Sequence, residues 1–318
     1  MGFKGLNKSV VVGILSTLTL AACSNNGANK SQIAATSTND SAIINGTVVS
    51  AQEALSKNIV GIFSRHDGED GVAICTGSLL KGNLVLTAAH CVDDFMYIVF
   101  STDMDSAVRG QVLAVDKVAV SPYWSSRQNA DKDHGDVALV HFVGTAPSDY
   151  TPATLLNDTS VLKNGASVVL AGYGANEVTR TPIDTNTYPD LVSAVQAGKV
   201  ICDDPKALTN CAEVDMPGAG VLRKTSVTIE DAKFAQSEVL LNQRNGTGAC
   251  HGDSGGPAYA TVNGQLYLWG VTSRGERDPN NDCSQYSVYT NAVFYKSWLN
   301  SVAQKLTASS STLQIAKK

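Results

Sequence analysis

The chain has 318 residues, of which 43% are hydrophobic and 17% are charged, and its formal net charge is -5. This composition excludes a disordered protein, and the length allows one large domain or two ordinary ones. The acidic balance and the absence of a basic stripe give no support to a nucleic-acid-binding role, so no nucleic acid is expected as a partner.

The first residues are typical of an export signal. Lys4 and Lys8 give a basic start, and the apolar run Val10–Leu20 is too short to span a bilayer but suits the core of a signal peptide. The run ends in Leu20-Ala-Ala-Cys23, which resembles a bacterial lipobox and implies removal of residues 1–22 and a lipid on Cys23. An ordinary signal peptide ending near this point is the alternative. We therefore expect an exported lipoprotein precursor, anchored in a membrane at the periplasm or the cell surface before processing.

The chain contains seven cysteines. If Cys23 carries lipid, six remain, and an even set in an exported protein predicts disulfides. These six are Cys75, Cys91, Cys202, Cys211, Cys250 and Cys283. No pair has the CxxC spacing of a zinc site, so no metal is expected, and no organic cofactor is implied.

Beyond the signal, residues 23–42 are polar and small, and we expect a flexible tether there. From Ile43 the sequence changes to short apolar or alternating runs separated by turn-sized gaps, which is typical of all-β sandwiches and barrels. The predicted strands are Ile59–Phe63, Val72–Leu80, Leu84–Thr87, Tyr97–Phe100, Val112–Val115, Val137–Phe142, Ser167–Leu170, Ser226–Ile229, Glu238–Leu241, Ala258–Val262, Leu266–Thr272 and Ser287–Tyr289.

Two segments interrupt this strand pattern. Residues 174–220 are long, polar and poor in strand pattern, which predicts a surface insertion. Near the end of the chain, apolar residues recur at helical spacing and predict a terminal helix, followed by a polar tail. They are Val293, Trp298, Val302 and Leu306.

The segment Cys250-His-Gly-Asp-Ser-Gly-Gly-Pro257 has the composition of a nucleophilic turn. A serine hydroxyl is a poor nucleophile that needs exposure on a tight turn and a neighbouring base. The flanking glycines let backbone amides approach the reacting oxygen, so the N–H groups of Gly252 and Ser254 are expected to form an oxyanion hole. The same residues fit the G-x-S-x-G elbow of α/β-hydrolases. Those enzymes place the histidine after the serine, and all five histidines here precede Ser254, which excludes that fold.

Two upstream motifs supply a base and an acid. Leu86-Thr-Ala-Ala-His90-Cys91 follows a predicted strand and resembles the TAAHC motif of the chymotrypsin/trypsin-like serine proteases. The acid lies in Gly135-Asp136-Val-Ala-Leu, which resembles the start of the strand that carries the acid in that family. The order His90, Asp136, Ser254 also matches. The resemblance implies a catalytic triad in which Asp136 orients and stabilises the His90 ring.

The same resemblance implies an all-β fold of two six-stranded antiparallel β-barrels with a C-terminal helix. The protease domain would cover 43–306, with barrels at about 43–155 and 156–290, an insertion at about 174–220 and a tail at 307–318. The implied disulfides are Cys75–Cys91 and Cys250–Cys283, and Cys202–Cys211 is expected to close the insertion. We expect a monomer that acts on polypeptide substrates.

Residues Ile43-Ile-Asn-Gly46 resemble the mature N-terminus of this family, commonly I-V-G-G, and depart from it at Asn45. The resemblance implies a zymogen, in which a cut before Ile43 frees an amine that pairs with Asp253. A buried carboxylate without a partner costs roughly 3–5 kcal/mol, so the pocket would stay disordered until the amine arrives.

The resemblance also assigns the substrate-binding residues, which are Gly248, His251, Ser273, Arg274, Gly275 and Ser287. Gly248 stands at the pocket floor, where trypsins carry an aspartate, so we expect apolar or aromatic residues rather than Arg or Lys before the cut. An Arg preference would require an acid such as Asp282 to reach the pocket. Arg274 replaces a tryptophan of the family, and its cation is expected to favour acidic residues further from the cut.

The sequence therefore predicts a secreted serine endopeptidase that works through an acyl-enzyme. An esterase activity at the same site is one alternative. A catalytically silent, lipid-anchored binding or adhesion homologue is another, although its class usually loses part of the triad or of the oxyanion turn.

Overall fold

A computed structural model describes residues 43–67, 72–127, 131–196, 199–204, 207–279 and 282–308. The predicted signal peptide, the lipidation residue Cys23, the tether and most of the tail lie outside the described residues. Among the residues that are described, no helix is long and apolar enough to cross a membrane.

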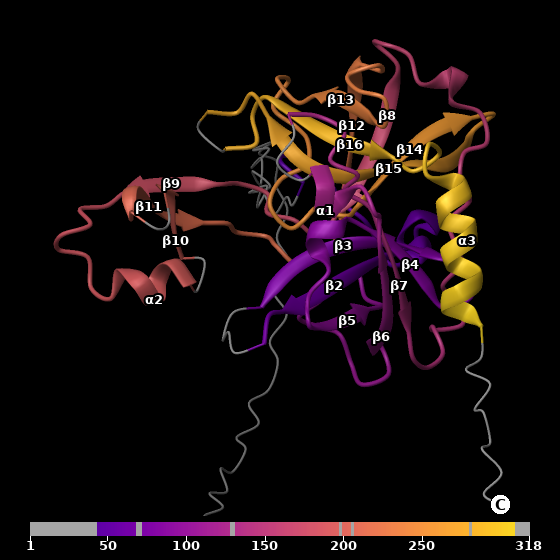
Figure 1. Ribbon diagram of the computed structural model, residues 1–318, viewed down its shortest axis with the longest axis horizontal. Coiled ribbons are helices and arrows are strands. Elements are labelled where there is room, and N and C mark those ends of the chain that lie inside the picture. The colour runs from indigo at the N-terminus through magenta and orange to yellow at the C-terminus, as the bar shows by residue number, and fades with distance from the viewer. Residues whose placement is uncertain are drawn as a thin grey trace, which may run out of the picture. The chain divides into compact units, whose positions relative to one another are not determined.

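The first half of the protein forms a closed antiparallel barrel in the order β2-β3-β4-β7-β6-β5 (Figure 1). Its strands are β2 (Ile59–Arg65), β3 (Ala73–Leu80), β4 (Leu84–Thr87), β5 (Phe95–Val99), β6 (Val112–Val120) and β7 (Ala138–Phe142). The short helix η2 (Ala89–Cys91) follows β4, and α1 (Trp124–Arg127) lies between β6 and β7. All residues of β4 are buried, as expected for a strand that packs on both faces.

The second half closes in the same way. Its order is β12-β13-β16-β15-β14-β8, and β8 pairs back onto β12. The strands are β8 (Ser167–Gly172), β12 (Arg223–Asp231), β13 (Glu238–Asn242), β14 (Pro257–Val262), β15 (Gln265–Glu276) and β16 (Tyr286–Asn291). The predicted fold of two six-stranded antiparallel barrels is therefore confirmed.

The N-terminal strand β1 (Thr47–Val48) joins the second barrel, where it pairs with β12 through Thr47↔Lys224 and Val48↔Arg223. The sequence-based boundary at about 43–155 placed these residues with the first barrel. A strand of two residues carries no periodic pattern, and its partner lies far along the chain, so the sequence pattern does not reveal this crossing.

The segment predicted as an insertion has more regular structure than its sequence suggests. It contains β9 (Thr179–Pro182), α2 (Leu191–Gln196), β10 (Val200–Asp204) and β11 (Thr209–Asp215), and the strands form a separate sheet in the order β10-β11-β9. Cys202 and Cys211 face each other across β10 and β11 and form a disulfide. Together with Leu191 and Val200 they make a small apolar cluster. None of these strands is among those predicted from the sequence, because short polar strands lack the apolar alternation used to detect them.

The predicted terminal helix is α3 (Lys296–Thr307). It follows the second barrel but packs against β6 and β7 of the first. Leu299 and Leu306 are buried on its inner face, and Lys117 donates a 2.8 Å hydrogen bond to the carbonyl of Leu306. The helix thus ties the end of the chain to the first barrel.

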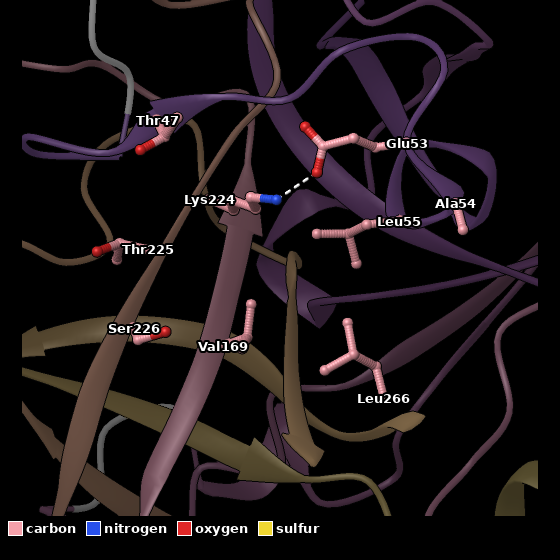
Figure 2. Close-up of a pocket in the computed structure, with 9 residues that line it drawn as sticks. All are labelled: Thr47, Glu53, Ala54, Leu55, Val169, Lys224, Thr225, Ser226 and Leu266. Carbon is pink, nitrogen blue, oxygen red and sulfur yellow. Dashed lines mark hydrogen bonds and ion pairs between the residues drawn. The ribbon is translucent and has the colours of Figure 1, made fainter. Parts of the chain in front are cut away.

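A hollow of about 560 Å³ is lined by Glu53 and by residues of β1, β8, β12, β15 and η1 (Ala54–Asn58). Figure 2 shows the residues that line it. Lys224 and Glu53 form an ion pair in it. None of the predicted site residues lines this hollow, so its volume alone does not identify it as the functional site.

Candidate active site

His90 and Asp136 are brought together by a pair of adjacent strands. His90 lies in η2 directly after β4, Asp136 lies just before β7, and β4 and β7 pair in antiparallel register through Thr87↔Ala138. His90 Nδ1 lies 2.8 Å from Asp136 Oδ2, and the His90 backbone N–H donates to Oδ1 at 3.1 Å. These two contacts hold the imidazole with its other ring nitrogen available.

Asp136 is 2% exposed and is also held by the second barrel. Ser273 of β15 donates its hydroxyl to Asp136 Oδ2 at 2.6 Å, and Thr290 of β16 donates to the Asp136 carbonyl at 2.9 Å. Burial raises the pKa of Asp136, but the hydrogen bonds and charge of His90 and the Ser273 hydroxyl outweigh it and lower the pKa. The carboxyl therefore stays ionised around neutral pH.

His90 responds in the opposite direction. Burial lowers its pKa, but the hydrogen bond and the negative charge of Asp136 overcome this and raise the pKa above the ordinary value. A histidine of this kind binds a proton more readily than a free one, which suits a general base.

The turn at Ser254 is pressed against the first barrel. The Ser254 carbonyl accepts a 2.8 Å hydrogen bond from the Thr76 N–H and lies 3.5 Å from Cys91 Sγ, the residue next to His90. Gly255 has φ +79°, and a Cβ there would lie 2.0 Å from the hydroxyl oxygen of Thr87, so no other residue fits. Within the described residues, the Ser254 hydroxyl makes no hydrogen bond to His90. Such bonds are often long before a substrate binds.

The two amides predicted for the oxyanion hole are Gly252 and Ser254. Neither N–H donates to an acceptor in the part of the chain that the structure describes. Gly252 has φ +95°, and its carbonyl accepts a 3.0 Å hydrogen bond from the Thr76 hydroxyl. A left-handed glycine fixed in this way orients the following amides, which leaves both N–H groups available to a bound oxygen.

Three disulfides join the predicted pairs, Cys75–Cys91, Cys202–Cys211 and Cys250–Cys283. The first lies beside His90, and the third links the turn before Ser254 to the segment that follows β15. Two of the three bridges therefore fix segments that carry predicted site residues.

A pocket of about 250 Å³ lies at Ser254. Five of the six predicted substrate-binding residues line it, namely His251, Ser273, Arg274, Gly275 and Ser287. The predicted floor residue, Gly248, does not line it, because the Gln243 side chain covers that position. A Cβ on Gly248 would lie 2.1 Å from Gln243 Cδ. Gln243 was missed from the sequence, since nothing in its local pattern distinguishes it from an ordinary residue at a strand end.

Arg274 does not present a free cation to the pocket. Its guanidinium donates to both carboxylate oxygens of Glu238, at 2.8 and 3.0 Å, and the Glu238 side chain is fully buried. Glu238 also accepts a 3.0 Å hydrogen bond from the N–H of His134, close to Asp136. The ion pair offsets the charge of Arg274, which removes the reason for expecting acidic substrate residues. Through Glu238, the ion pair also links β15 to the segment that carries Asp136.

Arg274→Ala is expected to destabilise the protein by about 3–5 kcal/mol, because it leaves the Glu238 carboxylate buried without its partner. Adding Glu238→Gln should recover most of this loss, since a neutral amide can still accept from His134. Urea unfolding of the two variants measures the difference. Equal stability of the single and double variants would contradict the role given to this ion pair.

An aromatic residue that the sequence analysis overlooked lies beside the candidate base. The ring of Trp124, in α1, has its centroid 6.3 Å from that of His90, and the two rings are tilted by 45°. Trp124 therefore places an aromatic ring next to His90.

The predicted activation residues are both buried. Ile43 is fully buried in the core of the second barrel, and the next residue, Ile44, forms a bridge with Gly248 in which its N–H donates at 2.9 Å. The Asp253 carboxylate accepts 2.8 Å hydrogen bonds from the N–H groups of Gly174 and Cys250. The residues before Ile43 lie outside the described residues.

Two closed β-barrels, with a buried Asp–His pair on the first and a serine turn and a pocket on the second, are the architecture of the trypsin-like serine protease family. A family model described as Trypsin matches residues 43–299. The chain therefore belongs to the trypsin family.

The similar proteins are distant. The chain is 26% identical over 232 residues to chymotrypsin-like elastase family member 1 of Macaca fascicularis, covering 71% of this chain and 77% of that protein. The Rattus norvegicus protein of the same name is 28% identical over 274 residues, covering 84% and 93%. A solved structure of HL collagenase has a TM-score of 0.57 at 19% identity, covering 82% of this chain and 98% of its own, and shows the fold alone.

Proposed function

We propose that this protein is a serine endopeptidase in which His90, Asp136 and Ser254 form the catalytic triad. The observation that carries the proposal is the 2.8 Å contact between His90 and a buried carboxylate, beside the serine turn and its pocket. In this mechanism His90 takes the Ser254 proton while the hydroxyl oxygen attacks the peptide carbonyl. The N–H groups of Gly252 and Ser254 stabilise the resulting oxyanion. The amine product leaves with that proton, and water then hydrolyses the acyl-enzyme.

The site favours an active enzyme over a silent binding homologue, because the acid, the base, the serine and two available amides are all present. An uncharged fluorophosphonate tests this, since it labels only an activated serine. We expect labelling of the purified protein and no labelling of Ser254→Ala. A wild-type protein that stays unlabelled after cutting before Ile43 would favour the silent homologue.

We further propose that the protein is exported as a lipoprotein, with its anchor on Cys23, and is made as a zymogen. The support for the anchor is the lipobox-like sequence, and the support for the zymogen is the motif at Ile43 together with the burial of Asp253. The predicted preference for apolar or aromatic residues before the cut rests on Gly248 alone. Gln243 covers that position, so this preference is tested separately from the reaction.

A further inference from the structure

The pocket beside Ser254 contains two polar atoms that the chain does not satisfy. Ser287 is 2% exposed, and its hydroxyl oxygen has no hydrogen-bond partner among the described residues. The same holds for Asp278 Oδ1, whose companion Oδ2 accepts a 2.6 Å hydrogen bond from the Cys283 N–H. Both residues line this pocket. Because a buried acceptor without a donor is unfavourable, these two oxygens indicate a ligand that brings donors.

The amide at the floor of the pocket is already fully bonded. Gln243 Nε2 donates to the carbonyls of Ala249 and Cys283, at 3.0 and 2.8 Å, and Oε1 accepts from the Ala249 N–H at 2.7 Å. The side chain also fills the space over Gly248. The floor is therefore neutral and rigid. The ligand that the pocket prefers then depends on the residues of its wall, Asp278 and Ser287.

The wall carries a carboxyl group that has no basic partner among the described residues. Within the described residues Asp278 forms no ion pair. Arg274 is engaged by Glu238, and Arg277 lies over an aromatic ring. Burial raises the pKa of Asp278, and the hydrogen bond and charge of the neighbouring Asp282 carboxyl raise it further, whereas hydrogen bonds from the Cys283 and Asp282 backbone lower it. A bound cation would relieve both effects, because it compensates the buried charge and screens the repulsion between the carboxyls.

We propose that Asp278 and Ser287 make this pocket bind the side chain of a lysine or arginine that precedes the cleaved bond. The inference rests on the proposed peptidase function and names the substrate class of that site. An ammonium or guanidinium group supplies only donors and a positive charge, which matches one carboxylate oxygen and one hydroxyl. The volume of about 250 Å³ suits a single side chain.

This specificity differs from the one predicted from the sequence. The prediction of apolar or aromatic residues before the cut rested only on Gly248. Faster cleavage after such residues is the competing outcome of the experiment below. From the sequence, an Arg preference requires an acid such as Asp282 to reach the pocket. The residue that lines the pocket is Asp278, in the same segment between β15 and Cys283.

A matched substrate series tests the inference. The peptides differ only in the residue before the cut, which is Arg, Lys, citrulline, Leu or Phe, where citrulline keeps the shape of Arg without its charge. We expect kcat/KM for Arg to exceed that for citrulline by about 10²-fold, and Asp278→Asn to remove most of this ratio. Glu276→Gln removes a carboxylate at the end of β15, two residues before Asp278 and outside the pocket lining, and should keep the ratio. Faster cleavage after Leu or Phe than after Arg and Lys overturns the inference.

A binding measurement separates this inference from the proposed reaction. Calorimetry on Ser254→Ala compares benzamidine, an aromatic cation, with its neutral analogue benzamide. We expect benzamidine to bind at least about 10-fold more tightly, and Asp278→Asn to remove the difference. Equal binding overturns the inference even where the fluorophosphonate labels the wild type. A wild type that resists the label but still prefers benzamidine overturns the proposed reaction and supports the pocket.

Discussion

Asp136→Asn is expected to lower kcat by about 10⁴-fold while leaving the fold intact. The factor is that of the corresponding change in a well-studied member of this family and does not come from the present distances. The physical reason is visible here, because Asp136 Oδ2 accepts from His90 Nδ1 at 2.8 Å. An amide that donates at this position would force the His90 proton onto the other ring nitrogen. That nitrogen could then no longer accept the proton of Ser254.

The protein contains a matched control for this substitution. His141 Nδ1 lies 2.5 Å from Asp116 Oδ1, on β7 and β6 of the same barrel, but this His–Asp pair lines none of the pocket at Ser254. Asp116→Asn should therefore leave kcat unchanged. Peptide hydrolysis and urea unfolding, measured on both variants, separate a loss of chemistry from a loss of structure. A small effect of Asp136→Asn on kcat would remove Asp136 from the triad.

The parts of the site that could be predicted are those carried by contiguous motifs. Gly255 shows why, since its left-handed backbone and its close approach to Thr87 admit only glycine, so the motif records the geometry directly. The His90–Asp136 pair likewise follows from two motifs at the ends of paired strands.

The wall of the pocket could not be predicted in this way. Gln243 becomes the floor only because its side chain folds over Gly248, and Asp278 lines the pocket from the segment that follows β15. Neither position has a local pattern. The pairing of β1 with β12 was missed for the same reason, because it depends on contacts between residues far apart in the chain.

The proposed zymogen makes the uncut protein sensitive to pH through Asp253. Burial raises the pKa of this carboxyl to about 7, although hydrogen bonds from Cys250 and Gly174 and the charge of Arg223 lower it. The unfolded chain loses the proton near pH 3.8, whereas the folded precursor keeps it until about pH 7. The folded state binds more protons between these values, so its stability falls as the pH rises through this window, by up to about 4 kcal/mol.

This pH dependence can be measured on the precursor form of Ser254→Ala, which cannot cut itself. Urea unfolding between pH 4 and pH 7 should show the decrease, and adding Asp253→Asn should abolish it. If the amine freed at Ile43 pairs with Asp253, the pKa of that carboxyl falls and the cut protein should lose the same dependence. An unchanged slope in Asp253→Asn would mean that another group titrates.

The proposed activating cut before Ile43 is also expected to release the enzyme from the membrane. The lipid on Cys23 would lie on one side of the Ala42–Ile43 bond and the whole protease domain on the other. The segment between them contains no further cysteine, and Cys23 is consumed by lipid, so no disulfide can retain the anchor. A single acyl chain binds a membrane marginally while two or more hold firmly, so the bound precursor and the free enzyme should separate cleanly.

After fractionation we expect the fluorophosphonate label in the soluble fraction, on a species that begins at Ile43. Full activity in a membrane-bound form that still carries Cys23 would show that no cut is needed, and Asp253 would then have to be satisfied without the amine.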